Sequence, residues 1–285
     1  MAKVNVVADS SCCLPPELAQ RFGILLASNG VVINKIVYRD QIDITTSNFW
    51  KIFEGSTETI TTNAVSPGDF FDIFTRLSKT SDGIACITLS QKLSGTFNSA
   101  VQAKEMASST LPNLKIEIID SMTSIGALSF IILEAARLAQ AGGNLDEVVS
   151  AAKNIIPRAK YLLVLETAKY IMRIGRAPAE AKKLEEQSHF SPIMGVVRNT
   201  GLVDMLGKEA DTMAAQRKAV EMIKNYADVN KPLHVMLHYS RNKSEVRELE
   251  KMISSQYKCE EIYISEFSPV VVAALGPSVG LAFYS

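Results

Sequence analysis

The first half of the chain alternates short apolar runs with longer segments of helical character. Residues 4–8, 84–89 and 115–119 have the length and the branched side chains of buried strands. Helices are expected over residues 96–108 and, after the third run, over a long segment that ends at Gly142-Gly143. This alternation predicts an α/β fold with a mostly parallel open sheet and helices on both faces.

Further helix starts are marked by residue types that favour the first turn. Pro15-Pro16-Glu17 has the composition of a first helical turn. Ser66, directly before Pro67, predicts an N-cap for a helix that runs to about Lys79. Asn144 occupies the same position before a helix over Leu145–Ile155.

The pattern changes after Asn144 and the helix that it caps, and the boundary is placed near Pro157. Residues 192–197 and 202–206 flank the linker Arg198-Asn199-Thr200-Gly201, in which Asn and Gly favour a tight turn between antiparallel strands. We therefore predict an N-terminal parallel α/β domain over residues 1–157 and a C-terminal α/β domain with a partly antiparallel sheet over residues 158–285. The other elements expected in the second domain are a strand at 162–165, helices at 167–176, 179–186, 212–226 and 244–257, a strand at 233–239 and a final apolar stretch.

Composition excludes some functions. Lys plus Arg and Asp plus Glu are 30 each, so the chain lacks the basic excess of a nucleic-acid-binding module. The most apolar segment, residues 125–139, is interrupted by Glu134 and Arg137, and no membrane span is expected. The chain starts with a strand-like run and no signal-peptide pattern, which predicts a cytoplasmic protein.

The cysteines and histidines do not indicate a metal site. The four cysteines lack CxxC spacing, and the adjacent Cys12 and Cys13 are too close for an ordinary disulfide. His234 and His238 lie in an alternating, strand-like run and have no partner at zinc-like spacing. We therefore expect reduced thiols and no metal.

Hydroxyl-rich segments, which are expected to be loops, are the main candidate site. They follow the predicted strands or precede a helix, and they are Asp9-Ser10-Ser11, Thr61-Thr62-Asn63, Ser90 to Thr96, and Asp120-Ser121. Ligands of open α/β sheets bind outside the carboxyl ends of the strands, where hydroxyls and helix N-termini suit a carboxylate or a phosphate. Each such Ser or Thr taken alone is more often a helix cap than a ligand, although Ser94-Gly95-Thr96 offers more polar groups than one cap needs.

An ordered set of motifs resembles the DegV family. The most distinctive is Leu93-Ser94-Gly95-Thr96-Phe97-Asn98-Ser99-Ala100. The others, in chain order, are Val7 to Ser11, Asp120-Ser121 with Gly126, the set Thr167, Tyr170, Gly175 and Arg176, and Gly276-Pro277 with Gly280 to Phe283. The resemblance covers about residues 6–283.

The resemblance implies a non-catalytic protein that buries a long-chain fatty acid in a tunnel between the two domains. It implies that Thr62, Ser94, Gly95 and Thr96 hold the carboxylate. Arg176 would be structural, a neighbour of the head group, or part of a partner surface. The implied partner is a separate kinase subunit that converts the presented carboxylate to an acyl phosphate, with transient contact to a membrane surface as a further expectation. No cofactor is implied.

The chain departs from the family pattern at three places. Where the family has Gly-Gly-Arg, this chain has Ile174-Gly175-Arg176. Where the family has a Thr-Ser-Gln-Pro loop, this chain has Thr62-Asn63-Ala64-Val65, which keeps only the threonine. The family's histidine before the terminal Gly-Pro is absent, because no histidine follows His238. These departures bear on the hand-off to a kinase more than on binding by hydroxyls.

Two alternatives remain open from the sequence. The chain could carry another amphiphile, such as a sterol or an isoprenoid acid. It could also be an enzyme of phosphate esters or phosphoryl transfer that uses Asp9 and Asp120 at strand ends, although no Walker-type loop is present.

Overall fold

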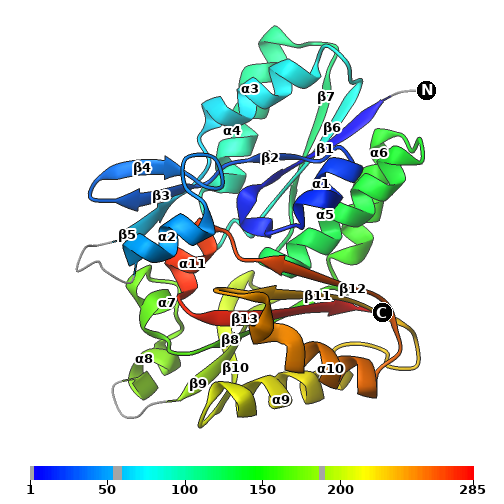
Figure 1. Ribbon diagram of the computed structural model, residues 1–285. Coiled ribbons are helices and arrows are strands. Elements are labelled where there is room, and N and C mark those ends of the chain that lie inside the picture. The colour runs from blue at the N-terminus through cyan, green and yellow to red at the C-terminus, as the bar shows by residue number, and fades with distance from the viewer. Residues whose placement is uncertain (1–2, 54–59, 186–189) are drawn as a thin grey trace.

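The computed structural model describes residues 3–53, 60–185 and 190–285, and its first sheet is the parallel sheet that the sequence predicts (Figure 1). All neighbouring strands in this sheet run parallel. Their order is β2 (Leu25–Ala27), β1 (Val4–Asp9), β6 (Gly83–Thr88) and β7 (Lys115–Asp120). Between β1 and β2 lie the 3-10 turn η1 (Ser10–Cys12) and the helix α1 (Pro16–Arg21).

Helices cover both faces of this sheet. On one face, α3 (Pro67–Leu77) and α4 (Thr96–Thr110) pack Phe70, Phe74 and small alanines against Val7, Ile84 and Cys86. The other face is covered by α5 (Ile125–Gln140) and α6 (Leu145–Ile155). The predicted caps are confirmed, because Ser66 and Asn144 each accept a hydrogen bond from the backbone N–H three residues later.

A small antiparallel sheet in the first half was not expected. Its strands, in order, are β4 (Ile36–Arg39), β3 (Gly30–Ile33) and β5 (Ile60–Asn63), with α2 (Thr46–Phe53) before β5. Asn34 and Lys35 form a two-residue hairpin turn with φ of 53° and 66°, the geometry of a type I′ turn. The expectation of a loop at Thr61-Thr62-Asn63 is therefore wrong, because these residues pair with β3 as an edge strand.

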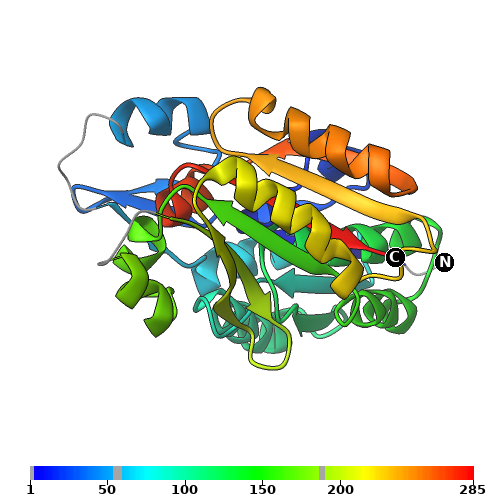
Figure 2. The ribbon, with the colours of Figure 1, turned by 90° about the horizontal axis from the view of Figure 1, so that it is seen from below.

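The second large sheet is mixed. It has the order β10 (Leu202–Glu209), β9 (Ser191–Val197), β8 (Lys160–Leu165), β13 (Ser278–Tyr284), β11 (Leu233–Tyr239) and β12 (Cys259–Glu266). The pair β11 and β12 is parallel and the other pairs are antiparallel, including the predicted hairpin of β9 and β10. Figure 2 shows α9 (Thr212–Met222) and α10 (Arg247–Gln256) lying across the outer face of this sheet.

Several helices in the second half are shorter than predicted. The helix expected over residues 167–176 is only α7 (Lys169–Arg173), because Gly175 adopts a φ of 71° and ends it. The helix α8 (Ala179–Glu185) reaches the edge of the described residues, and the expected end at residue 186 lies outside them. The helix expected over residues 212–226 ends in the 3-10 turn η2 (Ile223–Asn225). The helix expected over residues 244–257 begins with the 3-10 turn η3 (Lys243–Val246). Pro269 begins α11 (Pro269–Leu275) inside the final apolar stretch.

Helix α5 lies between the two large sheets (Figure 1). Eleven of its sixteen residues are buried, and nine of these belong to one core that includes Ala8 and Ile87 from the first sheet and Leu163 and Met236 from the second. A helix that is apolar on nearly all sides is expected to be buried in this way. The predicted boundary at residue 157 falls between α6 and β8, and the division into two domains stays a prediction because this core contains residues from both sides.

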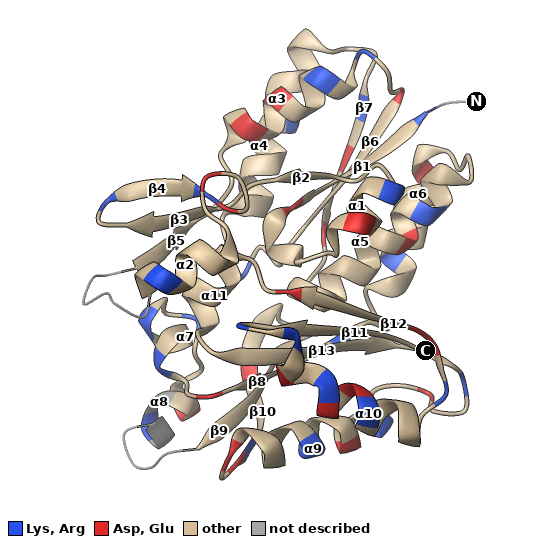
Figure 3. Cartoon of the chain, in the orientation of Figure 1, with Lys and Arg blue, Asp and Glu red and all other residues tan. Residues whose placement is uncertain are grey.

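The surface charge is mixed in sign. Figure 3 shows Lys and Arg interspersed with Asp and Glu, for example along α9 and α10. None of the helices in the described ranges has the length and apolar composition that a membrane span requires.

Candidate functional site

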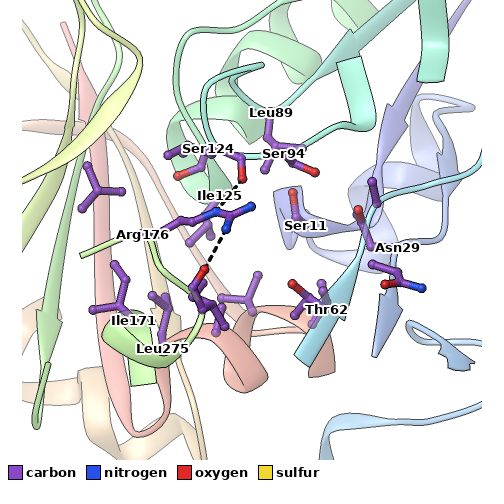
Figure 4. A pocket seen from close by; sticks show the side chains of 18 of the residues that line it. Ser11, Asn29, Thr62, Leu89, Ser94, Ser124, Ile125, Ile171, Arg176 and Leu275 are labelled. Carbon is purple, nitrogen blue, oxygen red and sulfur yellow. Dashed lines mark hydrogen bonds between the residues drawn. The ribbon is translucent and has the colours of Figure 1, made fainter. Parts of the chain in front are cut away.

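The candidate site is a cavity at the carboxyl edge of the parallel sheet, where the sheet meets the second half of the chain (Figure 4). Ser11 follows β1, Leu89 follows β6 and Ser124 follows β7. The opposite wall comes from β8, α7, β10 and α11. The cavity encloses about 920 Å³ of space between atoms, including the part that is open to solvent. Its position is the one expected for ligand sites of open α/β sheets.

The two walls of the cavity differ in polarity. Hydroxyl and amide groups gather on the side formed by the first half of the chain, and they belong to Ser11, Asn29, Thr62, Asn63, Ser94 and Ser124. The side formed by the second half is apolar apart from Arg176, with Leu163, Ile171, Val203, Val271 and Leu275 among its residues. An amphipathic cavity of this kind fits a ligand that has one polar end.

A buried carboxyl group fixes part of the polar wall. Asp9, at the end of β1, accepts hydrogen bonds from the backbone N–H groups of Ser11 at 3.1 Å and Leu89 at 2.9 Å. It also accepts from the Ser11 hydroxyl and from Asn29 Nδ2 at 3.1 Å. Burial raises the pKa of Asp9, and these donors oppose that rise. Asp9 therefore positions Ser11 and Asn29 and does not itself line the cavity.

Ser94 belongs to a chain of hydroxyl contacts. Its Oγ lies 3.0 Å from Thr96 Oγ1 and accepts a hydrogen bond from the Thr96 N–H at 3.3 Å. The Thr96 hydroxyl is buried and donates to Asn29 Oδ1 at 3.3 Å. Since Thr96 has only one hydroxyl proton, Ser94 donates to Thr96 in this arrangement. A ligand carboxylate would compete with Thr96 for that proton.

Two helices begin at the polar wall. Gly95 precedes the first residue of α4, and Ser124 precedes the first residue of α5. Backbone N–H groups at helix N-termini and the helix dipole both favour an anion. A Cβ on Gly95 would meet only Ala64, at 3.8 Å, so packing does not require glycine there. The backbone at Gly95 is thus open to a ligand.

Arg176 is the one cationic side chain among the described residues that line the cavity. Its Nε donates to the Leu93 carbonyl at 3.0 Å, and its Nη1 donates to the Ile174 carbonyl at 2.7 Å. Figure 4 shows the guanidinium group pointing toward the side of the cavity that carries Ser94. Arg176 therefore joins the segment after α7 to the loop before α4 and places a positive charge near the hydroxyls.

The apolar wall is anchored by a second buried carboxyl group. Asp40 accepts hydrogen bonds from Ser10 Oγ at 2.6 Å and from the Val270 N–H at the start of α11 at 3.0 Å. Burial raises the pKa of Asp40 to about 6, because the donors offset only part of the cost of desolvating the charge. Asp40 thus holds in place the helix that supplies Val271 and Leu275 to the cavity.

The histidines that the structure describes lie away from the cavity lining. His238 is fully buried on β11, where its Nε2 lies 3.3 Å from the Cys13 carbonyl oxygen. Burial lowers its pKa to about 3, so the ring is neutral near pH 7. His234 pairs with Glu261 at 2.8 Å on the far part of the sheet. His189 lies outside the described residues.

The structure gathers most of the predicted site residues. Thr62, Ser94, Gly95 and Arg176 line one cavity, whereas Thr96 lies behind Ser94 and supports it. The two acids of the phosphoryl-transfer alternative do not line the cavity: Asp9 lies behind Ser11 and Asn29, and Asp120 is not among the lining residues. The described residues also contain no cluster of three or more potential metal ligands.

Sequence reasoning missed two polar residues and most of the apolar wall. Ser124 directly precedes a long apolar helix, which is the ordinary signal of an N-cap and could have drawn attention to it. Asn29 has no local signal, because its role comes from contacts to Asp9 and Ser10 about twenty positions earlier. The apolar residues of α11 reach the cavity only through tertiary packing.

Comparison with known proteins gives consistent matches over the whole chain. A profile of the family described as "Uncharacterised protein, DegV family" matches residues 3–285. A DegV domain-containing protein from Clostridium perfringens is 27% identical over 281 residues, which is 98% of each chain. Another, from Caldanaerobacter subterraneus, is 27% identical over 284 residues and covers 100% of this chain and 99% of that protein.

Solved structures share the same fold. A DegV family protein from Thermus thermophilus, described by its fatty acid binding, superposes with a TM-score of 0.89 at 24% identity over all of both chains. A stearic-acid-binding protein from Eubacterium ventriosum has a TM-score of 0.88 at 22% identity, over 100% of this chain and 98% of that one. The sequence profile spans nearly every residue and the fold agrees with it, so this chain belongs to the DegV family.

Proposed function

We propose that this protein binds one long-chain fatty acid in the cavity and presents its carboxylate to a separate kinase subunit that makes an acyl phosphate. The observation that carries the binding proposal is the polarity of the cavity, with hydroxyls and two helix N-termini on one wall and aliphatic side chains on the other. The fatty acid binding described for the Thermus thermophilus protein and the stearic acid named for the Eubacterium ventriosum protein support the same ligand class.

The proposed roles follow from position. Thr62 and Ser94 donate hydroxyl protons to the carboxylate, and Gly95 allows close approach of the backbone. Thr96 orients Ser94 from behind. Arg176 supplies the positive charge, either next to the carboxylate or on the surface that the partner contacts. None of these groups is proposed as a nucleophile or a general base, and no cofactor or metal takes part in the proposed function.

Burial of the acyl chain provides most of the affinity. About fifteen methylenes at ~0.8 kcal/mol each are worth roughly 12 kcal/mol before the costs of ordering. The polar wall therefore needs to supply only orientation and enough hydrogen bonds to replace water around the carboxylate. A tunnel that encloses the whole chain, with its end between the two predicted domains, is part of this proposal.

The test is extraction of purified recombinant protein with organic solvent, followed by mass spectrometry. We expect a saturated or monounsaturated fatty acid, and we expect delipidated protein to take up palmitate or oleate. A sterol or an isoprenoid acid in the extract would point to another amphiphile. Extracts without lipid, from protein that also fails to take up palmitate and oleate, would exclude the proposed function.

Two further parts of the proposal concern where binding takes place. We propose a cytoplasmic protein that contacts a membrane surface transiently when it exchanges its ligand. Fractionation of native cells tests the first part, and transfer of labelled palmitate from phosphatidylcholine vesicles tests the second.

A further inference from the structure

A second cavity lies on the other side of the loop that leads into α5. Ser124 and Ile125 of this loop face the fatty-acid cavity, whereas Met122 and Thr123 line the second one. Met122 and Ile125 both have positive φ, 53° and 48°, which is unusual for residues with large side chains. The same strained loop thus separates two cavities.

The second cavity contains two cationic side chains and no acidic one. Lys160, on β8, is only 9% exposed. Its Nζ lies 3.5 Å from the Val196 carbonyl oxygen and 4.5 Å from the centre of the Tyr226 ring. Arg198 follows β9 and is exposed at the rim. Within the described part of the chain, neither cation forms an ion pair with a carboxylate.

A buried ammonium group without a counter-ion is costly, because most of its hydration has been removed. The Tyr226 ring and one carbonyl oxygen compensate only part of that cost. Burial lowers the pKa of Lys160, and the charge of Arg198 lowers it further. The two cations repel each other. An anion bound between them would replace this repulsion by attraction to both charges.

We propose that this cavity binds the phosphate group of a small soluble phosphate monoester, held by Lys160 and Arg198. A phosphate group carries nearly two negative charges at neutral pH, which matches the two cations. The planar guanidinium of Arg198 suits two phosphate oxygens at once, and Lys160 contributes a point charge from the buried side. Asn225 adds a polar group to the lining, and the Tyr226 ring offers a surface for the organic part of the ligand.

The test uses isothermal titration of the whole protein with inorganic phosphate and with glycerol 3-phosphate, at constant ionic strength. We expect saturable binding that weakens at least tenfold in Lys160→Met and in Arg198→Gln. The matched control is Arg217→Gln, which removes an exposed arginine of α9 outside the cavity and should bind like wild type. Because Arg198 is exposed, its variant is expected to fold even if Lys160→Met does not.

Three outcomes would overturn the proposal. The first is no saturable binding of either phosphate compound to wild type. The second is equal binding by wild type and Arg198→Gln, or equal weakening by Arg217→Gln. The third is binding only to vesicles that contain phosphatidic acid, which would assign the two cations to a lipid surface. Palmitate uptake in the same samples is measured separately and does not depend on the result.

Discussion

At the scale of single residues, Ser94 and Thr62 carry the proposed recognition of the carboxylate. Each should donate one charge-assisted hydrogen bond, so Ser94→Ala and Thr62→Ala should each weaken palmitate binding by about 1–3 kcal/mol. Thr61→Ala is the matched control, because Thr61 is the preceding residue of the same strand, is exposed, and is not part of the lining. Fluorescence competition with delipidated protein measures all three. Unchanged affinity in both test variants would show that the carboxylate lies elsewhere.

Asp40 should give folding a specific pH dependence. Its folded-state pKa of about 6 is above the ordinary value of 3.8, so the folded protein holds this proton more tightly than the unfolded chain does. The resulting stability is fully present below about pH 4 and is lost as the pH rises through 6. This difference in the pKa of Asp40 contributes on the order of 3 kcal/mol to the free energy of unfolding.

Urea unfolding between pH 4 and pH 7.5 measures this effect. Asp40→Asn cannot ionise, so it should lose less stability than wild type over this range. The control is Asp43→Asn, since hydrogen bonds from Arg39 hold the pKa of Asp43 down at about 2, below the window. If Asp40→Asn and wild type show parallel curves, Asp40 does not titrate as described.

At the scale of elements, α5 is the helix that both large sheets pack against. Its second residue, Gly126, has no room for a side chain, because a Cβ there would lie 2.6 Å from the Ala282 Cβ, 2.8 Å from His238 Cε1 and 2.9 Å from Tyr161 Cε2. Gly126→Ala should therefore force the second sheet away from α5 and destabilise the protein by about 1–3 kcal/mol.

The matched control is Gly68→Ala in the first turn of α3, where the nearest atom to a new Cβ is Ser66 Oγ at 3.7 Å. That change should be neutral or slightly stabilising, because alanine favours a helix more than glycine does. Chemical denaturation compares the two variants. Equal stability of Gly126→Ala and wild type would contradict the close packing of α5 on the second sheet.

Elements with a strong local pattern were predictable from the sequence. Three of the four strands of the parallel sheet were found, as were the caps at Ser66 and Asn144 and the hairpin near Gly201, because periodicity, capping and turn chemistry are local signals. The fourth strand, β2, was missed; it has only three residues, too few to show a periodicity. The hairpin around Asn34 was missed although its turn residues and branched neighbours were visible. The shortening of α7 was missed because it depends on the positive φ of Gly175.

At the scale of the whole molecule, the site depends on contacts between distant segments. The hydroxyls of the first half could be anticipated because parallel strands end at one edge of a sheet. The apolar wall could not, because α11 reaches the cavity through its hydrogen bond to Asp40, 230 positions away in the chain. Further buried bonds join the halves, from Thr46 Oγ1 to the Phe267 carbonyl at 2.8 Å and from Trp50 Nε1 to the Ser240 carbonyl at 2.6 Å.

The central claim is that one fatty acid lies in this cavity with its carboxylate against Ser94. Carbon-13 NMR of palmitate labelled at the carboxyl carbon, added to delipidated protein, tests it most directly. We predict one bound carboxyl resonance that saturates at one equivalent, moves in Ser94→Ala and stays in place in Thr61→Ala. The absence of a bound resonance, or a bound resonance that Ser94→Ala leaves unmoved, would contradict the account.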